Sequence, residues 1–300
     1  MLEIYNDFCT FLIKKKKTSD NTLMSYKRDL KAFIDFLQSK KIDDFKRVDS
    51  ALIETYIKFL NKNKKSAATI SRNLSSLRCF FKFLITKKII TFNPMIGVKT
   101  DGKKVNDLPS ILSAKDVATL LSSPDTTSDK GIRDKAMLEV MYATGLRVSE
   151  LLSVKIHDVN LEIGYIIIAK ATSKERIVPL YPIAIECLKN YIDNVRATLL
   201  SKNNSTDILF LNSTGAEMSR QGFWKIIKAY AKDSKIDADI TPKVLRHSFA
   251  THLLENGADI HMLKDMLGHS DISSTMVYAK ILKSKYMNIY ENCHPRAKTI

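Results

Sequence analysis

Two cationic side chains three residues apart mark a candidate phosphate site towards the C-terminus. Thr241 can cap a helix and Pro242 is favoured at the first helical position, so we expect a helix to begin here. Lys243 and Arg246 then share one face of its first turn, where free N–H groups and the helix dipole also favour an anion. This spacing therefore predicts the binding of a phosphate group.

Arg147, in the segment ATGLRVSEL, is a second candidate phosphate ligand. We expect one helix to end at Gly145 and Ser149 to cap the next, which would hold the arginine in a tight turn. A planar guanidinium can donate two parallel hydrogen bonds to phosphate oxygens. Taken alone, the same residue is more simply explained as a cap on the carbonyl groups of the preceding helix.

Three more side chains of suitable chemistry stand in turns or beside them. Lys170 ends a β-rich run, from which a turn lysine could reach a substrate as a proton donor. His269 follows an expected helix end at Gly268, and Tyr278 lies further on in an expected short helix. Turn lysines are usually solvated and single tyrosines usually pack, so these signals gain weight only in combination.

The elements that must position these residues change from helical to β-rich and back. Runs at 165–169 and 176–180 predict a β-hairpin, to which 208–211 could add a third strand. The helices expected around them run from Ser113, with Asp116 completing a capping box, to about Leu121, from 132 to 142, and beyond Ser219.

The N-terminal third has helical periodicity alone. Apolar residues recur at helical spacing in four stretches, and Asp49 or Ser50 could cap the third. Four such stretches predict a compact four-helix domain. The apolar stripes comprise Ile4, Phe8 and Leu12; Tyr26, Leu30, Phe33 and Leu37; Leu52, Ile53, Tyr56, Ile57 and Leu60; and Ile70, Leu74, Leu77, Phe81 and Leu84.

The fourth of these helices has a second face of a different kind. Ser71, Ser75, Arg78 and Lys82 recur there at helical spacing. Hydroxyls and cations together are what a helix in a DNA groove presents, although a solvated helix face gives the same pattern.

Residues 93–108 have the composition of a linker. Asn93 and Pro94 would stop a helix, and the stretch that follows is rich in glycine and lysine and poor in apolar residues. We therefore expect one domain over 1–92 and a second over 109–300.

Net charge indicates a polyanionic partner, either nucleic acid or an anionic membrane surface. The chain of 300 residues carries a formal charge of +16. Residues 1–105 hold 23 Lys+Arg against 10 Asp+Glu, a net of +13. We therefore expect this part to attract a polyanionic partner more strongly than the rest of the chain. A general bias towards lysine in the source proteome is the alternative explanation.

Other features of the composition favour a protein of the reducing cytoplasm. The N-terminus does not have the pattern of a signal peptide, and no apolar run approaches the length of a membrane span. Neither a disulfide framework nor a zinc site is expected, because the four cysteines are scattered. These are Cys9, Cys79, Cys187 and Cys293.

In combination, the motifs resemble the tyrosine recombinase family, or phage integrases. ATGLRVSEL, KERIVPL, VLRHSFATHLL and LGHSDISSTMVYAK look like blocks of its catalytic domain, and NTLMSYKRDLKAFIDFL looks like its core-binding domain. The ending ENCHPRAKTI is similar to that of the Xer recombinases, which resolve chromosome dimers. The resemblance implies a mainly α-helical protein with an N-terminal four-helix, SAM-like domain and a C-terminal mixed α/β catalytic domain containing a small antiparallel sheet.

The resemblance also implies a mechanism. A tyrosine attacks the scissile phosphate and forms a 3′-phosphotyrosine, so neither a metal, ATP nor another cofactor is expected. Xer-type members usually have histidine where this chain has Lys243, whereas Glu150 and His247 are expected to support the site rather than react. The implied catalytic residues are Arg147, Lys170, Lys243, Arg246, His269 and Tyr278. The expected DNA contacts are Ser71, Ser75, Arg78 and Lys82 on the fourth helix, with Lys174 and Arg176 in the hairpin.

The implied partners are a double-stranded recombination site and other recombinase subunits, and no membrane. Two DNA sites would be held by a homo- or heterotetramer, with a paralogous recombinase or an activator protein as open additions. The stretch containing Ile281, Tyr286, Ile289 and Tyr290 could dock on a neighbouring subunit or pack on its own domain. Three alternatives to dimer resolution remain: a phage or mobile-element integrase, a type IB topoisomerase, and a non-catalytic DNA-binding protein.

Overall fold

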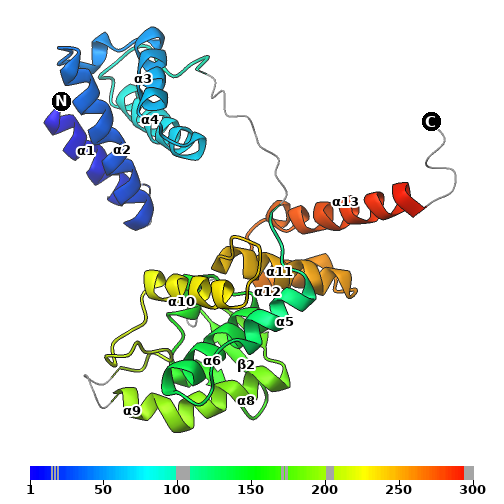
Figure 1. The fold of residues 1–300 in the computed structure, drawn as a ribbon. Helices are drawn as coiled ribbons and strands as arrows, with labels where there is room; N and C mark the ends of the chain where they lie inside the picture. The colour runs from blue at the N-terminus through cyan, green and yellow to red at the C-terminus, as the bar shows by residue number, and fades with distance from the viewer. Residues whose placement is uncertain are drawn as a thin grey trace. The chain divides into compact units, whose positions relative to one another are not determined.

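The chain divides into two compact units, residues 1–106 and 107–300, each with a hydrophobic core of its own (Figure 1). The predicted mainly α-helical architecture with one small antiparallel sheet is confirmed. The computed structural model describes residues 1–14, 16, 18, 20–98, 109–169, 172, 175–200 and 206–293, without the side chains of 284–286 and 288–293.

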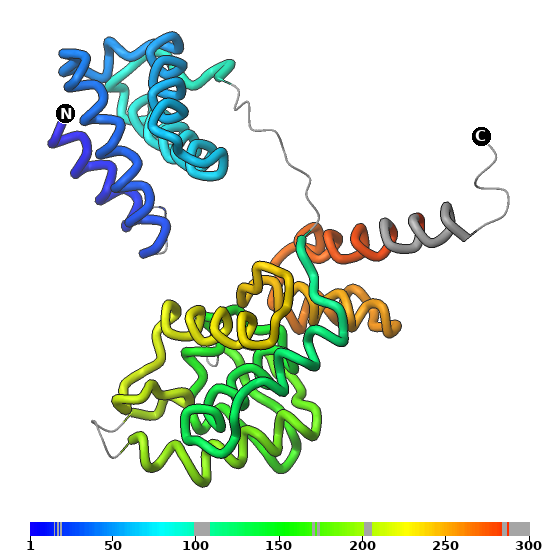
Figure 2. Tube along the Cα trace, viewed as in Figure 1, coloured from blue at the N-terminus to red at the C-terminus, as the bar shows by residue number. Residues whose placement is uncertain are grey.

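The N-terminal unit contains the four predicted helices, which Figure 2 follows along the trace. Of the two candidate caps for the third helix, Asp49 is the one used, because its carboxylate accepts a hydrogen bond from Leu52 N at 2.8 Å. The elements are α1 (Leu2–Lys14), α2 (Asp20–Ser39), the 3₁₀ helix η1 (Phe45–Arg47), α3 (Ser50–Lys62) and α4 (Ala67–Thr86).

Aromatic packing and one buried carboxylate hold this unit together. The rings of Phe33 and Tyr56 meet edge to face, with their centroids 4.9 Å apart. Asp29 on α2 is buried, so it needs partners: Ser76 on α4 donates a hydrogen bond to it at 2.8 Å, and Arg72 forms an ion pair with it. These contacts fix α2 against α4.

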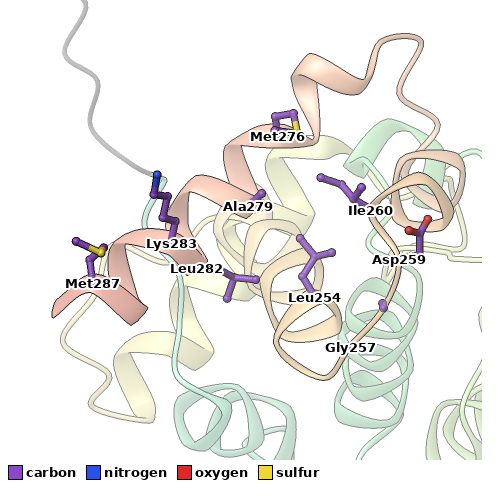
Figure 3. A pocket seen from close by; sticks show the side chains of 10 residues that line it. Leu254, Gly257, Asp259, Ile260, Met276, Ala279, Leu282, Lys283 and Met287 are labelled. Carbon is purple, nitrogen blue, oxygen red and sulfur yellow. The ribbon is translucent and has the colours of Figure 1, made fainter. Parts of the chain in front are cut away.

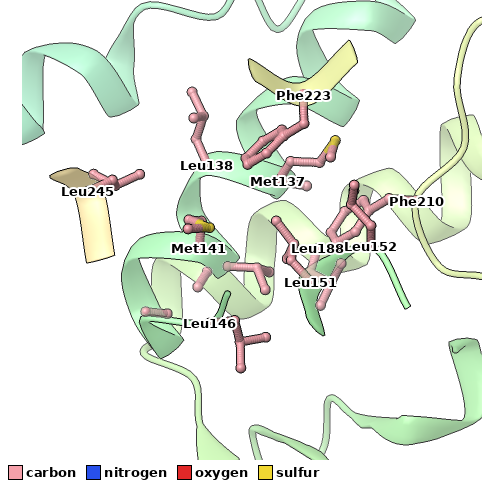
Figure 4. Close-up of a cluster of buried hydrophobic side chains, with 14 of the residues drawn as sticks. Met137, Leu138, Met141, Leu146, Leu151, Leu152, Leu188, Phe210, Phe223 and Leu245 are labelled. Atoms are coloured by element: carbon pink, nitrogen blue, oxygen red, sulfur yellow. The ribbon is translucent and has the colours of Figure 1, made fainter. Parts of the chain in front are cut away.

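The C-terminal unit is arranged around α6, whose two sides are both covered. Met137, Leu138 and Met141 lie on α6 among side chains from several neighbouring segments, including Leu188 and Phe223 (Figure 4). The helix is buried on most sides, and the charged residues that this burial includes, Arg133 and Asp134, form an ion pair at 2.7 Å. The helices are α5 (Ala114–Ser122), α6 (Asp129–Thr144), α7 (Val148–Leu151), η2 (Ile156–Asp158), α8 (Pro182–Asn190), the π-helix η3 (Tyr191–Arg196), α9 (Ala197–Leu200), α10 (Arg220–Asp233), α11 (Pro242–Glu255), α12 (Ile260–Leu267), η4 (Ile272–Ser274) and α13 (Met276–Cys293).

The sheet contains the predicted hairpin, β2 (Tyr165–Ile168) paired antiparallel with β3 (Arg176–Pro179). Its third strand is the short β1 (Val159–Asn160), and the strand order is β1-β2-β3. Ile166 and Val178 are buried and lie opposite each other, so the inner face of the hairpin packs on the core.

The prediction of a third strand at 208–211 was wrong, because this stretch forms only isolated bridges. Side chains take the place of a strand ladder there. The hydroxyl of Tyr191 donates to Leu209 O at 3.0 Å and accepts from Leu211 N at 3.1 Å. Arg196 donates to Ile208 O at 2.6 Å. An unbroken apolar run is compatible with a buried strand, and only its tertiary partners show otherwise.

Among the helices of the described residues, none combines the length and the apolar character needed to cross a membrane.

Candidate active site

Four segments of the C-terminal unit converge on one hollow of about 360 Å³. The turn after α6 contributes Arg147, α11 contributes Lys243 and Arg246, the turn after α12 contributes His269, and α13 contributes Tyr278. The structure thus brings together five of the six residues predicted to be catalytic. The sixth, Lys170, lies outside the described residues, as does Lys174.

Two glycines and one cap shape the turns that carry these side chains. Gly145 ends α6 with φ +58°, and a Cβ there would lie 2.2 Å from the Phe249 ring. Gly268 ends α12 with φ +62°, and a Cβ would lie 2.8 Å from the Arg176 guanidinium. Thr241 caps α11 by accepting a hydrogen bond from Val244 N, as predicted. Both helix ends therefore stop where a close neighbour leaves no room for a side chain.

Arg246 is the buried centre of the site, with 7% of its surface exposed. Its Nη1 donates to Gly145 O at 2.6 Å, and its Nη2 donates to Leu267 O at 2.9 Å. Burial, with the nearby charge of Arg147, lowers the pKa of Arg246 to about 10. The guanidinium is therefore still charged at neutral pH and ties the ends of α6 and α12 to α11.

Glu150 holds the cations of the hollow in place. Its carboxylate accepts from Arg147 N at 2.9 Å and Arg147 Nη1 at 3.0 Å, and from Arg176 Nη2 at 3.0 Å. Burial opposes its ionisation, but the hydrogen bonds and charges of the two arginines outweigh burial and lower the pKa of Glu150. The expected role of Glu150 as an orienting partner of the Arg147 turn fits this arrangement.

The prediction that Ser149 caps α7 was wrong. Arg147 occupies the cap position, and Glu150 in the first turn accepts from its backbone N–H. Ser149 lies inside the first turn, and the N–H groups that it would cap already donate within the helix, Leu151 N to Arg147 O and Leu152 N to Val148 O. The Arg147 side chain is 46% exposed at the mouth of the hollow.

Arg176 does not extend to solvent as a DNA contact would. Its side chain is 10% exposed, and its Nε donates to Met266 O at 2.8 Å in addition to its ion pair with Glu150. Arg176 therefore lies beside α12, a contact between residues 90 positions apart that the sequence does not indicate. Arg176 thus links β3 to α12 and to Glu150, and its predicted contact with DNA stays a prediction.

His269 is fixed through both ring nitrogens. Its Nε2 lies 3.0 Å from Arg246 Nη2, and its Nδ1 lies 2.8 Å from the buried hydroxyl of Thr275. Because a guanidinium can only donate, Nε2 accepts and the ring proton is on Nδ1. Burial and the charge of Arg246, followed by other arginines, lower the pKa of His269 to about 4. Thr275 was missed in the sequence, where a threonine before a helix suggests only a cap.

Tyr278 lies in the first turn of α13, which has 18 residues rather than the expected short helix. It is 2% exposed, and its hydroxyl lies 3.0 Å from Nδ1 of His247. Burial raises the pKa of Tyr278, against the opposing charge of Arg246. The phenol is therefore protonated at neutral pH and close to a ring nitrogen.

Two family models cover most of the chain: the phage integrase family over residues 110–285, and the phage integrase N-terminal SAM-like domain over residues 5–88. The chain belongs to the phage integrase family. It is 42% identical over 298 residues to the tyrosine recombinase XerD of Listeria monocytogenes, covering 99% of this chain and 100% of that protein. It is 45% identical to XerD of Oceanobacillus iheyensis, covering 97% and 98% of the two chains.

A crystal structure of the XerH recombinase bound to its palindromic difH substrate has the same fold. The TM-score is 0.77 at 21% identity, with 96% of this chain and 83% of that chain covered. Full-length similarity to the XerD proteins makes this integrase-family chain a Xer-type tyrosine site-specific recombinase.

Lys243 is a cation of this recombinase site that is open to an incoming ligand. It is exposed on the first turn of α11, and it lines the same hollow as Arg246. Among the described residues, no carboxylate forms an ion pair with it. An ammonium group in this place can meet an anion without first losing a partner.

The predicted DNA face of α4 lies on the surface of the SAM-like domain. Ser71, Ser75, Arg78 and Lys82 are all exposed. One donor group of Arg78 is already used within the domain, because its Nη2 donates a hydrogen bond to Val98 O at 3.1 Å. The other cation of this face, Lys82, is also exposed to solvent.

A second hollow, of about 990 Å³, lies between α13 and the end of α11 with the loop into α12 (Figure 3). Leu254, Ile260 and Leu282 point towards it, so its lining is largely apolar. Ile281, expected to belong to a docking tail, is buried in the core of its own domain with Phe249 and Leu263. The side chains of Tyr286, Ile289 and Tyr290, the rest of that prediction, lie outside the described residues.

Within the described part of the chain, no group of three or more His, Cys, Asp or Glu side chains is arranged to hold a metal ion.

The two histidines of the site predict that stability depends on pH. Burial lowers the pKa of both His247 and His269 to about 4, against about 6.5 in the unfolded chain. Between these values the unfolded chain binds more protons, so the free energy of unfolding should fall as pH drops from about 6.5 towards 4. The double variant His247→Asn, His269→Asn should lose less stability over this range.

The measurement is urea unfolding from pH 7.5 to 4.5, followed by fluorescence of Trp224, the only tryptophan, which reports on the C-terminal unit alone. His261→Asn, an exposed imidazole on α12, is the control and should follow the wild type. If the free energy of unfolding falls equally in the double variant and the wild type, the His247 and His269 rings are not the source of the pH dependence.

Proposed function

We propose that this recombinase cleaves DNA with Tyr278 as nucleophile and rejoins it from a 3′-phosphotyrosine. The observation that carries the assignment is the convergence of two arginines, a lysine, a histidine and a buried tyrosine from four distant segments on one hollow. Such a set fits a phosphodiester, because it supplies cations and donors for the oxygens and a hydroxyl for the phosphorus.

The proposed roles follow from charge and position. Arg147 and Arg246 donate to the non-bridging oxygens, where negative charge builds up, and His269 is held beside Arg246 at 3.0 Å to orient the phosphate. Lys170 is assigned as the acid that protonates the leaving 5′ oxygen. The phosphotyrosine keeps the energy of the broken bond, so ligation needs no ATP.

We further propose that the chain resolves chromosome or replicon dimers in the cytoplasm, as part of a tetramer on two DNA sites. Full-length similarity to the XerD proteins supports this role, and the XerH structure contains its DNA substrate. The net charge of +16 fits a partner whose backbone is anionic. Residues 1–92 would act as a DNA clamp, with α4 towards the duplex, and 109–300 as the catalytic domain.

Tyr278→Phe should abolish covalent attachment to DNA while leaving DNA binding in place, since the ring still packs and only the hydroxyl is lost. The recombination site is first identified by sequencing the host DNA that the protein protects. The substrate is a nicked duplex of that sequence, and the product is seen as a covalent protein–DNA band on a denaturing gel. Tyr165→Phe on β2, outside the hollow, is the matched control and should still give the band. A covalent band from Tyr278→Phe would overturn the assignment.

Two identical copies of the recovered site in one supercoiled plasmid should be resolved into two smaller circles, because a dimer-resolving enzyme joins like sites. Parallel reactions contain the protein alone and the protein with a paralogous recombinase from the same host. Relaxation without new circles in both reactions would indicate topoisomerase action. Joining that requires two unlike sites would indicate an integrase.

Lys243→Ala should slow single-turnover cleavage by about 10²-fold, the usual effect of losing one donor to the transition state. A lysine is charged at neutral pH, so we propose that Lys243 stabilises the phosphate and does not take the proton of Tyr278. Lys243→His should regain part of the rate, and more of it below about pH 6.5, where imidazole is charged.

The readout is cleavage of the nicked substrate between pH 5.5 and 8.5, with the exposed Lys235→Ala as control. Wild-type rates in Lys243→Ala would mean that the lysine is merely solvated. A Lys243→His variant that is fastest at high pH would instead indicate a base at this position.

A further inference from the structure

The hydroxyl of Tyr278 lies within hydrogen-bond distance of a histidine that the family resemblance does not place in the catalytic set, in addition to its interaction with Arg246. His247 Nδ1 lies 3.0 Å from the Tyr278 oxygen, and the two rings pack with centroids 5.5 Å apart. His247 directly follows Arg246 on α11, and α11 packs along α13, which carries the tyrosine. Two packed helices therefore hold the imidazole against the hydroxyl.

The other nitrogen of His247 is also informative. Nε2 is buried and has no hydrogen-bond partner among the described residues. Leaving a buried polar atom unpaired lowers the stability of the fold by about 1–3 kcal/mol, so packing alone does not explain an imidazole at this position. The single bond that the ring does form is the one to Tyr278.

His247 is neutral at neutral pH and so has a lone pair to offer. Burial lowers its pKa to about 4, and the charges that add to this effect are Lys243 and Arg246 on α11 and the His269 ring after α12. Tyr278 is the titratable group that faces it from α13. Two of these neighbours, Lys243 and Arg246, are the cations proposed to bind the DNA phosphate.

The remaining side chains of the hollow are poor acceptors for this proton. Lys243 is a cation. His269 uses Nε2 to accept from Arg246, and its Nδ1 is bonded to Thr275. The carboxylate of Glu150 is bound by Arg147 and Arg176.

We propose that His247 is the general base of strand cleavage, an inference that rests on Tyr278 as the nucleophile. As the Tyr278 oxygen forms its bond to phosphorus, its proton passes to His247 Nδ1 and the bond from phosphorus to the 5′ oxygen breaks. The 5′ oxygen takes a proton from the acid assigned to Lys170. The phosphodiester carries one negative charge before and after the step, and Arg147 and Arg246 stabilise the further charge that builds up on its non-bridging oxygens in between. Ligation returns the proton from His247 to the tyrosine oxygen and the proton of the attacking 5′ hydroxyl to Lys170.

Bound DNA makes His247 a better base than it is in the free protein. The phosphate places a negative charge beside Lys243 and Arg246, which offsets two of the charges that disfavour the imidazolium. The pKa of His247 then rises from about 4 towards the working pH, where proton transfer is most efficient. The base thus becomes effective when substrate is present.

His247→Asn tests the proposal, because asparagine can still hydrogen-bond the hydroxyl but cannot accept its proton. Single-turnover cleavage of the nicked substrate should slow by roughly 10²-fold or more, with unchanged DNA affinity. The remaining rate should rise about tenfold per pH unit, since hydroxide must now ionise the phenol. Wild type and the exposed control His261→Asn should be nearly independent of pH around neutrality.

A substrate with sulfur in place of the 5′ bridging oxygen distinguishes the role of the general base from that of the general acid. Thiolate leaves without a proton, so this substrate should restore cleavage to Lys170→Ala but not to His247→Asn. Wild-type speed in His247→Asn, or its rescue by the sulfur substrate, would overturn the inference. Loss of DNA affinity in His247→Asn would show that the ring positions the helix instead.

Nitrogen-15 NMR of the histidines in the wild-type chain gives a test that needs no substitution. The inference requires the neutral ring of His247 to carry its proton on Nε2, leaving Nδ1 free to accept. A proton on Nδ1 would make the ring a donor to Tyr278 and would overturn it. A covalent band from Tyr278→Phe, in contrast, would remove the proposed nucleophile itself, so the two failures are distinguishable.

Discussion

The arrangement of the site depends on how one buried guanidinium is satisfied. Arg246 has its charge inside the domain, where an unpaired ion would cost about 3–5 kcal/mol. The carbonyl groups of Gly145 and Leu267 meet this need, and both stand at helix ends, where the dipole is negative. Since α6 and α12 must end beside Arg246, the residues that follow, Arg147 and His269, reach the same hollow.

The free site contains more positive than negative charge, and this imbalance explains its protonation states. Glu150 compensates Arg147 and Arg176, while Arg246 relies mainly on carbonyl groups. Burial and the remaining positive charge keep the His269 ring neutral, with a pKa of about 4. A phosphate supplies the missing anion, so substrate binding and the proton chemistry of the site are coupled through the same cations.

Local signals in the sequence were sufficient for most helix ends and insufficient for the side-chain partners. The stops at Gly145 and Gly268 and the start at Thr241 depend on backbone rules that act within one turn, and each is present. The strand predicted at 208–211 does not form, because the side chains of Tyr191 and Arg196 hydrogen-bond to the backbone of this stretch. No local pattern in the sequence indicates these contacts. Nothing next to Arg176 in the sequence indicates that it pairs with Glu150.

The sequence by itself determined the helical periodicity, the excess of positive charge and the family, because these depend on residue types and short spacings. Which atoms meet in the hollow was decided by the tertiary structure alone. His247 lies next to Arg246 in the chain, yet the two side chains have different partners: Arg246 bonds to two helix ends and His247 to Tyr278. Contacts between residues 31 positions apart depend on the packing of α11 against α13, and no local pattern encodes that packing.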